Sequence, residues 1–514
     1  MTEKEKTIKS IVIMVVFTLG GKVLGFFREM LIASRFGSGA ETDAFFMAIS
    51  GIYLFSSIVS SSINTTFIPI LFEIEEEEGK YGKIKHTNNM LNIMTIISMI
   101  IILIAYFLAP YIVKVMASGF NEDQFIMTIN LFRLGLPMIL FSAYIGTFTG
   151  YLHSEQSFFS TSILAYPMNL VYIVYLIFFY KYFQIPGLMV TAVLAYVGQY
   201  LIQIPIARKH GFNKLWEIDF KDVYIKKFFY LSLPVILGVG INDVNAILDK
   251  MFASRLIEGS VSALNYATKL NQLILGVFIM AITTVVFPLL SKEVSKRNKK
   301  GVAEALLKGI RLIFVITIPA VVGMIVLSKP IVSLVFERGA FDSKASIMTA
   351  EVLVYYSLGL VFTSLKLLLD KAYYSLKDTK LPMYIGIVTV LCNSLLNLLL
   401  VDFMGHKGLA LATSISVSIS TLIMYIRLDS KEIIINNRKL LKFIIRVLLS
   451  SLIMGLIVFF EYKWLIGRSS EIIAFLLTGF SGLIVYIWFC YIFRVDEIVK
   501  IIMLLKNRWR GYES

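Results

Sequence analysis

Three basic side chains stand inside long apolar stretches of the sequence, where a charge is costly. They are Lys22, Arg28 and Lys269, and Gln272 follows Lys269 by about one helical turn. An ionisable group at the centre of a bilayer costs about 2.5–3.5 kcal/mol on insertion scales, so it should face a water-filled cavity or a partner. Desolvated Arg and Lys bind phosphate and carboxylate strongly. These residues predict a cationic cavity that binds an anionic substrate.

Other charged residues at the ends of apolar stretches are also candidates for substrate binding. Arg35 lies near the end of the first stretch, Asp43 opens the second, and Arg255 is the counterpart of Arg35 later in the chain. A different class of function uses the acids instead. In a cation-coupled small-molecule antiporter, Asp43, Asp243 and Asp249 would be proton or sodium sites, although a positive cavity argues against a cationic substrate.

No pattern of residues indicates catalysis. Cys392 and Cys490 lie within apolar runs and are interpreted as small buried hydrophobes, and the four histidines lack metal-ligand spacing. The dipeptide Gly21-Lys22 lacks the preceding glycine spacing of a phosphate-binding loop. We therefore expect a transporter with no metal and no cofactor, and not an enzyme.

The elements that carry these residues are membrane-spanning helices. Of the 514 residues, 57% are hydrophobic and 16% charged, whereas soluble domains are about 45–50% apolar and 25% charged. Apolar runs of about 20 residues, enough for one bilayer crossing, recur along the whole chain. The sequence predicts an all-α integral membrane protein with fourteen transmembrane helices. The predicted spans are 10–36, 44–71, 90–117, 125–152, 158–181, 184–207, 228–254, 261–290, 303–328, 347–376, 381–403, 408–427, 441–462 and 471–493.

Basic residues gather in alternate loops, at 80–85, 208–227, 292–300, 377–380 and 427–442. Such loops face the cytoplasm, and an even number of crossings then places both termini there as well. The loops are short and lack interleaved aromatic residues, so nucleic acid is not an expected partner. The acidic run at 73–78 is interpreted as a solvated turn.

The chain also resembles itself. Three pairs of segments match at offsets of 219 to 221 residues, namely 33–38 with 253–260, 65–71 with 283–290, and 187–192 with 408–412. Two six-helix halves that enter the membrane from the same side are parallel repeats, an arrangement in which a central cavity lies between two rocking halves. The predicted divisions are an N-terminal half at 1–217, a C-terminal half at 218–432, and two appended helices with a tail at 433–514.

Several motifs distributed along the chain carry a family resemblance. They include KVLGFFRE at 22–29, TDAFF at 42–46, GSVSALNYATKL at 259–270, FERGAFD at 336–342 and AYYSLKDTKLP at 372–382. Together they resemble the MurJ (MviN) lipid II flippases of the MOP exporter superfamily, over nearly the whole chain.

The resemblance implies a monomeric transporter in the bacterial cytoplasmic membrane that moves undecaprenyl-pyrophosphate-linked peptidoglycan precursor from the inner to the outer leaflet by alternating access. It implies that Lys22, Arg28 and Lys269 line the central cavity and that Asp43 is an associated acid. The last two helices would form a groove for the lipid tail. Residues 51–57 replace an arginine-containing segment of the family, so a flippase for another polyprenyl-pyrophosphate oligosaccharide stays open. No residue identifies a coupling ion.

Overall fold

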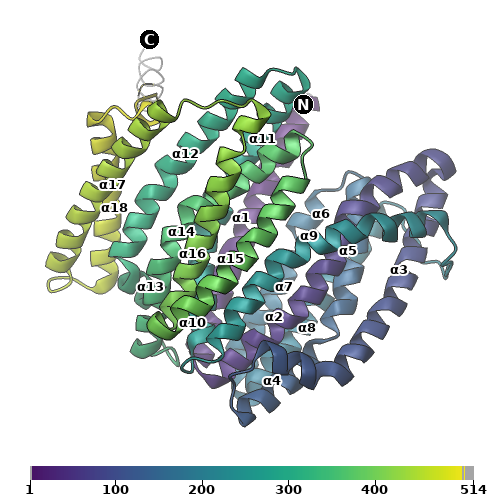
Figure 1. The fold of residues 1–514 in the computed structure, drawn as a ribbon. Coiled ribbons are helices and arrows are strands. Elements are labelled where there is room, and N and C mark those ends of the chain that lie inside the picture. The colour runs from purple at the N-terminus through teal and green to yellow at the C-terminus, as the bar shows by residue number, and fades with distance from the viewer. Residues whose placement is uncertain (1–2, 501–502, 504–514) are drawn as a thin grey trace. The chain divides into compact units, whose positions relative to one another are not determined.

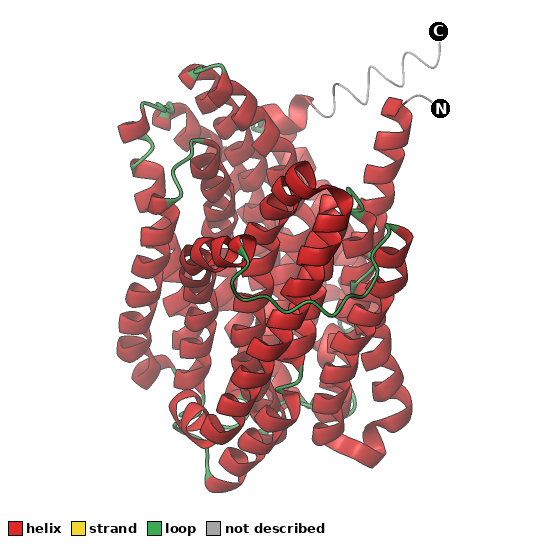
Figure 2. Ribbon diagram, turned by 90° about the vertical axis from the view of Figure 1, so that its right-hand side faces the viewer, coloured by secondary structure: helices red, strands yellow, loops and turns green. Residues whose placement is uncertain are grey.

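The computed structural model describes residues 3–500 and 503. Within these residues the regular elements are all helical, joined mostly by short loops, and no strand occurs (Figure 2). This confirms the predicted fold class. Ten helical stretches of the described chain are long and apolar enough to cross a membrane.

The helices follow one another along the chain with few interruptions (Figure 1). The first half of the sequence contains α1 (Glu3–Phe36), α2 (Ala40–Ser62), α3 (Ile68–Met116), α4 (Glu122–Gly135), α5 (Met138–Ser154), α6 (Phe159–Ser162), α7 (Ala165–Val174), α8 (Tyr180–Lys209) and α9 (Val223–Ala253). The second half contains α10 (Ser260–Ile274), α11 (Met280–Ser295), α12 (Lys299–Val326), α13 (Ser328–Phe336), α14 (Ser343–Ser375), α15 (Lys380–Met404), α16 (His406–Ile426), α17 (Asn437–Leu465) and α18 (Glu471–Ile492). Three π-helical turns, Ile63–Phe67, Tyr175–Phe179 and Leu275–Ile279, join α2 to α3, α7 to α8 and α10 to α11.

Two of the ten membrane-length stretches are too long for one crossing. Ala40–Met116 has 77 residues, about 115 Å of helix against a hydrocarbon core of about 30 Å. Gly79, with φ 71°, breaks this stretch, and Gln184, with φ 44°, breaks the 51-residue stretch Phe159–Lys209. The length and the break make each stretch consistent with two crossings. With α1 and α9, which are 34 and 31 residues long, the helices are consistent with the fourteen predicted.

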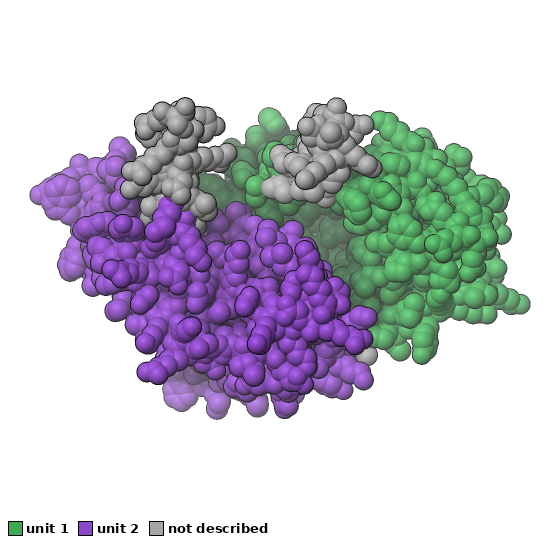
Figure 3. Space-filling model, turned by 90° about the horizontal axis from the view of Figure 1, so that it is seen from above, with its two compact units in different colours: residues 1–262, 338–342 green, residues 263–337, 343–514 purple. Residues whose placement is uncertain are grey.

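By packing, the chain forms two compact units (Figure 3). Unit 1 comprises residues 1–262 and 338–342, and unit 2 comprises residues 263–337 and 343–514. Helix α9 packs within unit 1, although the sequence repeat assigns it to the second half. The divisions at residues 217 and 432 describe sequence similarity and stay a prediction.

In unit 1, helix α1 packs closely on α7 because its contact face carries glycines. A Cβ atom added at Gly21 would lie 2.6 Å from the Cβ of Ala165. The Asn169 amide donates to the backbone oxygen of Gly21 over 3.1 Å. Small residues at such contacts let transmembrane helices approach closely. Gly21 thus serves a close contact between two helices.

Helices α2 and α9 are joined by polar contacts along their length. The Ser57 hydroxyl donates to the Asp243 carboxylate, and Lys250 Nζ lies 2.5 Å from Ser50 Oγ. Thr66 and Ser232 share a hydrogen bond of 3.0 Å. Hydrogen bonds between helices inside a membrane contribute roughly 0.6 kcal/mol each on average. These contacts fix the register of α9 against α2.

The acidic run at 73–78 is not the solvated turn that we predicted. Glu75 lies 2.6 Å from the Lys83 ammonium, which is 1% exposed and also lies 2.5 Å from Glu155. Glu73 pairs with Lys227 and Glu78 with His86. The run is helical and lies in the first part of α3, where it neutralises basic residues of α3 and of the start of α9, while Glu76 and Glu77 are exposed.

Unit 2 is built around a hydrophobic core from α11, α12, α14 and α16 to α18. The two appended helices, α17 and α18, contact α12. A Cβ atom at Gly455 would lie 2.5 Å from Val322, and the Tyr486 hydroxyl donates to Val315 O over 2.7 Å. Their other faces expose large apolar side chains such as Phe460 and Phe480, as expected for surfaces in contact with lipid.

Candidate functional site

Arg28 lies in the last third of α1 and is largely buried. Its Nη2 atom lies 2.6 Å from Glu29 Oε1, and the two side chains are 12% and 7% exposed. The guanidinium also lies 4.9 Å from the centre of the Tyr172 ring. Within the described residues, the Nε atom of Arg28 is buried without a hydrogen-bond partner. A buried unsatisfied donor is uncommon in proteins, and here it leaves one N–H of a buried cation available to an anion.

Lys22 lies six residues before Arg28 on α1 and is partly exposed. Six residues correspond to about 9 Å along the axis and about 120° around it from Arg28. The two cations therefore cannot hold one phosphate between them, but both can border a single hydrated path.

Arg35 makes three contacts with the segment that joins α7 to α8. Its Nε donates to Leu176 O over 3.3 Å, and its Nη1 to the Tyr180 hydroxyl over 3.2 Å. The guanidinium also stacks 4.4 Å from the centre of the Tyr180 ring. Arg35 thereby joins the end of α1 to the π-helical turn before α8.

Asp43 is 2% exposed and accepts three hydrogen bonds. The donors are the backbone N–H of Gly259 at 2.7 Å, the backbone N–H of Ser262 at 2.8 Å and the Ser262 hydroxyl at 2.6 Å. A carboxylate at a helix N-terminus is favoured by the unpaired N–H groups and the helix dipole. Asp43 is therefore a cap for the first turn of α10, supplied by α2. It also borders a polar cavity of about 280 Å³ with Gln124 and Glu258.

Arg255 is exposed and lies in the loop between α9 and α10. Its Nε donates to Ser118 Oγ over 3.1 Å, and Gly119 N donates to Ser254 Oγ over 3.3 Å. At the equivalent position of the other repeat, Ala340 N donates to Ser34 O, in the last turn of α1, over 2.8 Å. The last turn of α1 and the residue that follows α9, which match in the sequence repeat, thus make similar contacts.

Lys269 and Gln272 lie on α10 in unit 2. Lys269 is partly buried and Gln272 is exposed. A spacing of three residues puts both side chains on one face of the helix. The structure therefore brings together Arg28 with Glu29, and Asp43 with the α9–α10 loop. A common cavity for all seven candidates stays a prediction.

Several contacts of the candidates could not be read from the sequence. Tyr172 and Tyr180, which stack on arginines of α1, lie more than a hundred residues away in the chain. Asp243 was considered as an ion site, and the structure pairs it with Ser57 of α2. Within the described residues no group of three or more His, Cys, Asp or Glu side chains could hold a metal ion.

Three comparisons place the chain among known proteins. A family described as "Lipid II flippase MurJ" matches residues 32–475. A relative from Buchnera aphidicola subsp. Baizongia pistaciae, described as a probable lipid II flippase MurJ, is 29% identical, over 91% of this chain and 92% of its own.

Solved structures agree with the sequence comparisons. A lipid II flippase MurJ in an inward closed conformation matches with a TM-score of 0.80 and 25% identity, over 95% of this chain and all of the other. A multidrug resistance MATE family transporter of the MOP superfamily matches with a TM-score of 0.68 at 13% identity, over 80% of this chain and 96% of its own. The second match shows a shared fold.

Proposed function

Because the chain belongs to the MurJ family, we propose that it is a lipid II flippase, a transporter that carries undecaprenyl-pyrophosphate-linked peptidoglycan precursor from the inner to the outer leaflet of the bacterial cytoplasmic membrane. The observation that carries this proposal is Arg28, a cation largely buried in a membrane helix, whose Nε has no hydrogen-bond partner within the described residues. A desolvated guanidinium suits a phosphate oxygen, which it can bind through parallel N–H donors.

In this proposal, Lys22, Arg28, Lys269 and Gln272 contact the pyrophosphate and sugar as these cross by alternating access. The polyprenyl tail stays in lipid, so only the polar headgroup needs a hydrated path. The hydrogen bonds of Arg35, Asp43 and Arg255 support a positional role, in which these residues hold the ends of α1, α2 and α9.

The proposal includes an orientation and an energy source. The basic loops put both termini in the cytoplasm, and the chain acts as a monomer. The membrane potential provides about 2.3 kcal/mol per elementary charge per 100 mV, which would act on a negative headgroup or on a coupling ion.

The other functions considered have less support. Flipping of a different polyprenyl-pyrophosphate oligosaccharide would use the same cations, but the comparisons favour lipid II. Cation-coupled antiport would need Asp243 to bind an ion, and this carboxylate accepts a hydrogen bond from Ser57.

Transport of labelled lipid II in vesicles tests the proposal. We expect the purified protein to translocate lipid II, and Arg28→Ala to lower the rate roughly tenfold or more, since an ionic hydrogen bond is worth about 1.5–3 kcal/mol. Arg28→Ala also leaves Glu29 buried without this partner. The double variant Arg28→Ala/Glu29→Gln removes that charge and should transport as slowly.

The control is Arg468→Ala, because Arg468 is exposed in the turn between α17 and α18, and it should transport at the normal rate. Melting temperatures show whether each variant is folded. If folded Arg28→Ala supports growth of flippase-depleted cells as well as the unchanged protein does, Arg28 is not a substrate contact. If the unchanged protein moves no lipid II, the proposed function itself is wrong.

A further inference from the structure

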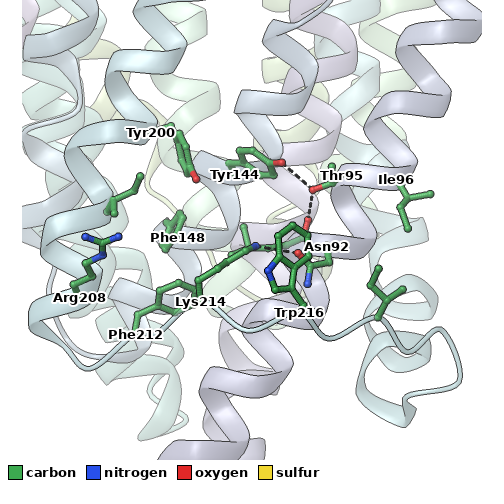
Figure 4. Close-up of a pocket in the computed structure, with 13 residues that line it drawn as sticks. Asn92, Thr95, Ile96, Tyr144, Phe148, Tyr200, Arg208, Phe212, Lys214 and Trp216 are labelled. Atoms are coloured by element: carbon green, nitrogen blue, oxygen red, sulfur yellow. Dashed lines mark hydrogen bonds between the residues drawn. The ribbon is translucent and has the colours of Figure 1, made fainter.

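A groove lies in unit 1 where the segment 210–222, between α8 and α9, runs across the middle of α3, the second half of α5 and the end of α8. Its volume is about 460 Å³, within the range of about 300–1,000 Å³ usual for small-molecule sites. Figure 4 shows that Tyr144, Tyr200 and Phe148 line one side, and Phe212, Lys214 and Trp216 line the other. None of the seven candidate transport residues lines it. The lining residues are Leu91, Asn92, Thr95, Ile96, Tyr144, Phe148, Tyr200, Ile204, Arg208, Phe212, Lys214, Trp216 and Ile218.

The segment that closes the groove is fixed by asparagines of α3. Asn92 is 6% exposed, and its amide donates to Leu215 O at 3.3 Å and to Glu217 O at 2.8 Å. Asn88 and Asn89 make similar bonds to the backbone of residues 213–219. The segment follows a defined course because buried amide groups satisfy its backbone. The groove is therefore a formed feature of the fold.

The same asparagine places a cation in the groove. Lys214 Nζ donates to Asn92 Oδ1 over 2.9 Å and lies 5.5 Å from the Trp216 ring centre. Partial burial lowers the pKa of Lys214 from its usual value. An ammonium has three N–H donors, and Asn92 accepts one of them. Lys214 can therefore bind an anion through its remaining N–H groups while its hydrogen bond to Asn92 fixes the ammonium in place.

The lining has one sign of charge and a large apolar part. Arg208 is the second cation, and among the described residues that line the groove none is acidic. Thr95 and Tyr144 add hydroxyls, which share a hydrogen bond of 2.9 Å. The remaining lining is aromatic or aliphatic. Two cations beside an apolar wall match a ligand with an anionic head and a hydrocarbon body.

The surroundings place the groove at a membrane surface. Trp216 is 86% exposed, and Ile218 and Phe220 are also exposed. Exposed Trp beside Lys and Arg is typical of the boundary between headgroups and acyl chains. The basic residues of the neighbouring loops indicate that this side of unit 1 faces the cytoplasmic leaflet. Anionic lipids in that leaflet attract basic residues.

We propose that this groove binds the headgroup of an anionic glycerophospholipid, with Arg208 and Lys214 on the phosphodiester and with Trp216 and Ile218 against the acyl chains. The site is separate from the proposed transport path and concerns a resident membrane lipid. The two cations attract the negative charge of a phosphodiester, whereas a pyrophosphate joined to sugars brings more polar bulk than the largely aromatic and aliphatic lining suits.

Native mass spectrometry of the full-length protein with defined lipids tests this. We expect dioleoyl phosphatidylglycerol to bind more tightly than dioleoyl phosphatidylcholine. The variant Arg208→Gln/Lys214→Gln should bind phosphatidylglycerol about thirtyfold more weakly, from the loss of two charge contacts at a membrane surface. Arg438→Gln/Lys439→Gln is the matched control. It removes the same charge from the exposed first turn of α17 and should bind as the unchanged protein does.

The proposal is overturned if the groove variant keeps normal phosphatidylglycerol binding, or if the control loses as much as the groove variant. It is also overturned if undecaprenyl pyrophosphate binds the unchanged protein more tightly than phosphatidylglycerol does and this binding is lost in the groove variant. The groove would then hold the transported lipid.

A second measurement does not depend on folding of the variant. Photoactivatable phosphatidylglycerol in vesicles should crosslink the unchanged protein at residues 200–218, and crosslinks confined to other segments contradict the site. Failure of lipid II transport would leave all these results unaffected, because none of them measures transport.

Discussion

The Asp43 carboxylate accepts both the backbone N–H and the hydroxyl of Ser262, which lies 219 residues further along the chain. Asp43 is at the start of the second helix of one repeat, and Ser262 is at the start of the second helix of the other. The bond therefore joins equivalent positions of the two repeats, and it holds the loop before α10 against α2. Asp43, a candidate substrate-binding residue in the sequence, thus also caps the first turn of α10 in the fold.

Replacing this carboxylate by an amide should destabilise the protein. In Asp43→Asn the charge is lost, and the new NH₂ group faces N–H donors. We expect a loss of about 2 kcal/mol, the scale of a hydrogen bond to a charged group, seen as a lower melting temperature in detergent. Asp123→Asn, in the exposed first turn of α4, should have little effect. A melting temperature for Asp43→Asn equal to that of Asp123→Asn would contradict the cap.

Two equivalent glycines should be intolerant of a side chain. A Cβ atom at Gly119 would lie 2.4 Å from Arg255 Cα, and one at Gly339, where φ is +61°, would lie 2.2 Å from Ser34 O. Gly119→Ala and Gly339→Ala should each cost more than about 2 kcal/mol by overpacking and strain, measured as folded yield and melting temperature. Gly323→Ala in α12, where nothing lies within 4 Å, should be neutral or stabilising by up to about 1 kcal/mol. Equal behaviour of all three variants would refute these close contacts.

The buried Lys83, in the first part of α3, should matter more for stability than the exposed Lys80. Lys83→Met leaves Glu75 and Glu155 without the ammonium that lies 2.6 and 2.5 Å from them. We expect a cost of about 2 kcal/mol, less than for a fully buried pair because Glu75 is partly hydrated. Lys80 is 54% exposed and 3.7 Å from Glu155, so Lys80→Met should change the melting temperature little. If Lys80→Met lowers the melting temperature more than Lys83→Met does, Lys83 is not the centre of this charge network.

Stability should depend on acid pH through Asp378, which lies between α14 and α15. The hydrogen bond from Lys431, at 2.7 Å, and the backbone N–H of Leu381 lower the pKa of Asp378 below its usual 3.8. A carboxyl with a lowered folded-state pKa stabilises the fold above its unfolded pKa and loses this as the pH falls through the folded value. The contribution is at most about 1 kcal/mol, because the pair is partly exposed.

The variant Asp378→Asn lacks this titration. The unchanged protein should therefore melt slightly higher than Asp378→Asn at pH 7, and the difference should shrink as the pH falls below about 4. Melting curves of both proteins from pH 7 to pH 3 measure it. A gap that widens on acidification would contradict the assigned pKa direction.

The sequence was sufficient for features that depend on local pattern. Apolar length and the matched segments of the repeat predicted an all-helical membrane protein, and Arg28 was recognised because a charge in an apolar run is anomalous whatever surrounds it. Contacts across the fold were not predictable in this way. The partners of Arg35 and Asp43 are 145 and 219 residues away, and no period in the sequence identifies them.

The acidic run shows the same limit at a surface. A run of glutamates is usually solvated. Here α9 brings Lys227 beside Glu73, and the end of α5 brings Glu155 beside Lys83, the partner of Glu75. The groove at 210–222 depends on three asparagines that, in the sequence, look like ordinary polar residues near a helix end.

The hydrogen bond between Ser57 and Asp243 has a consequence for biosynthesis. The two residues are 186 positions apart, and a ribosome adds about 5–20 residues per second, so α2 waits roughly 10–40 s after its own synthesis before α9 emerges. During that interval Ser50, Ser57 and Thr66 lack their partners on α9. A chain that ends before residue 232 lacks all three partners, so these polar groups of α2 and of the π-helical turn after it stay without their α9 contacts until α9 is made.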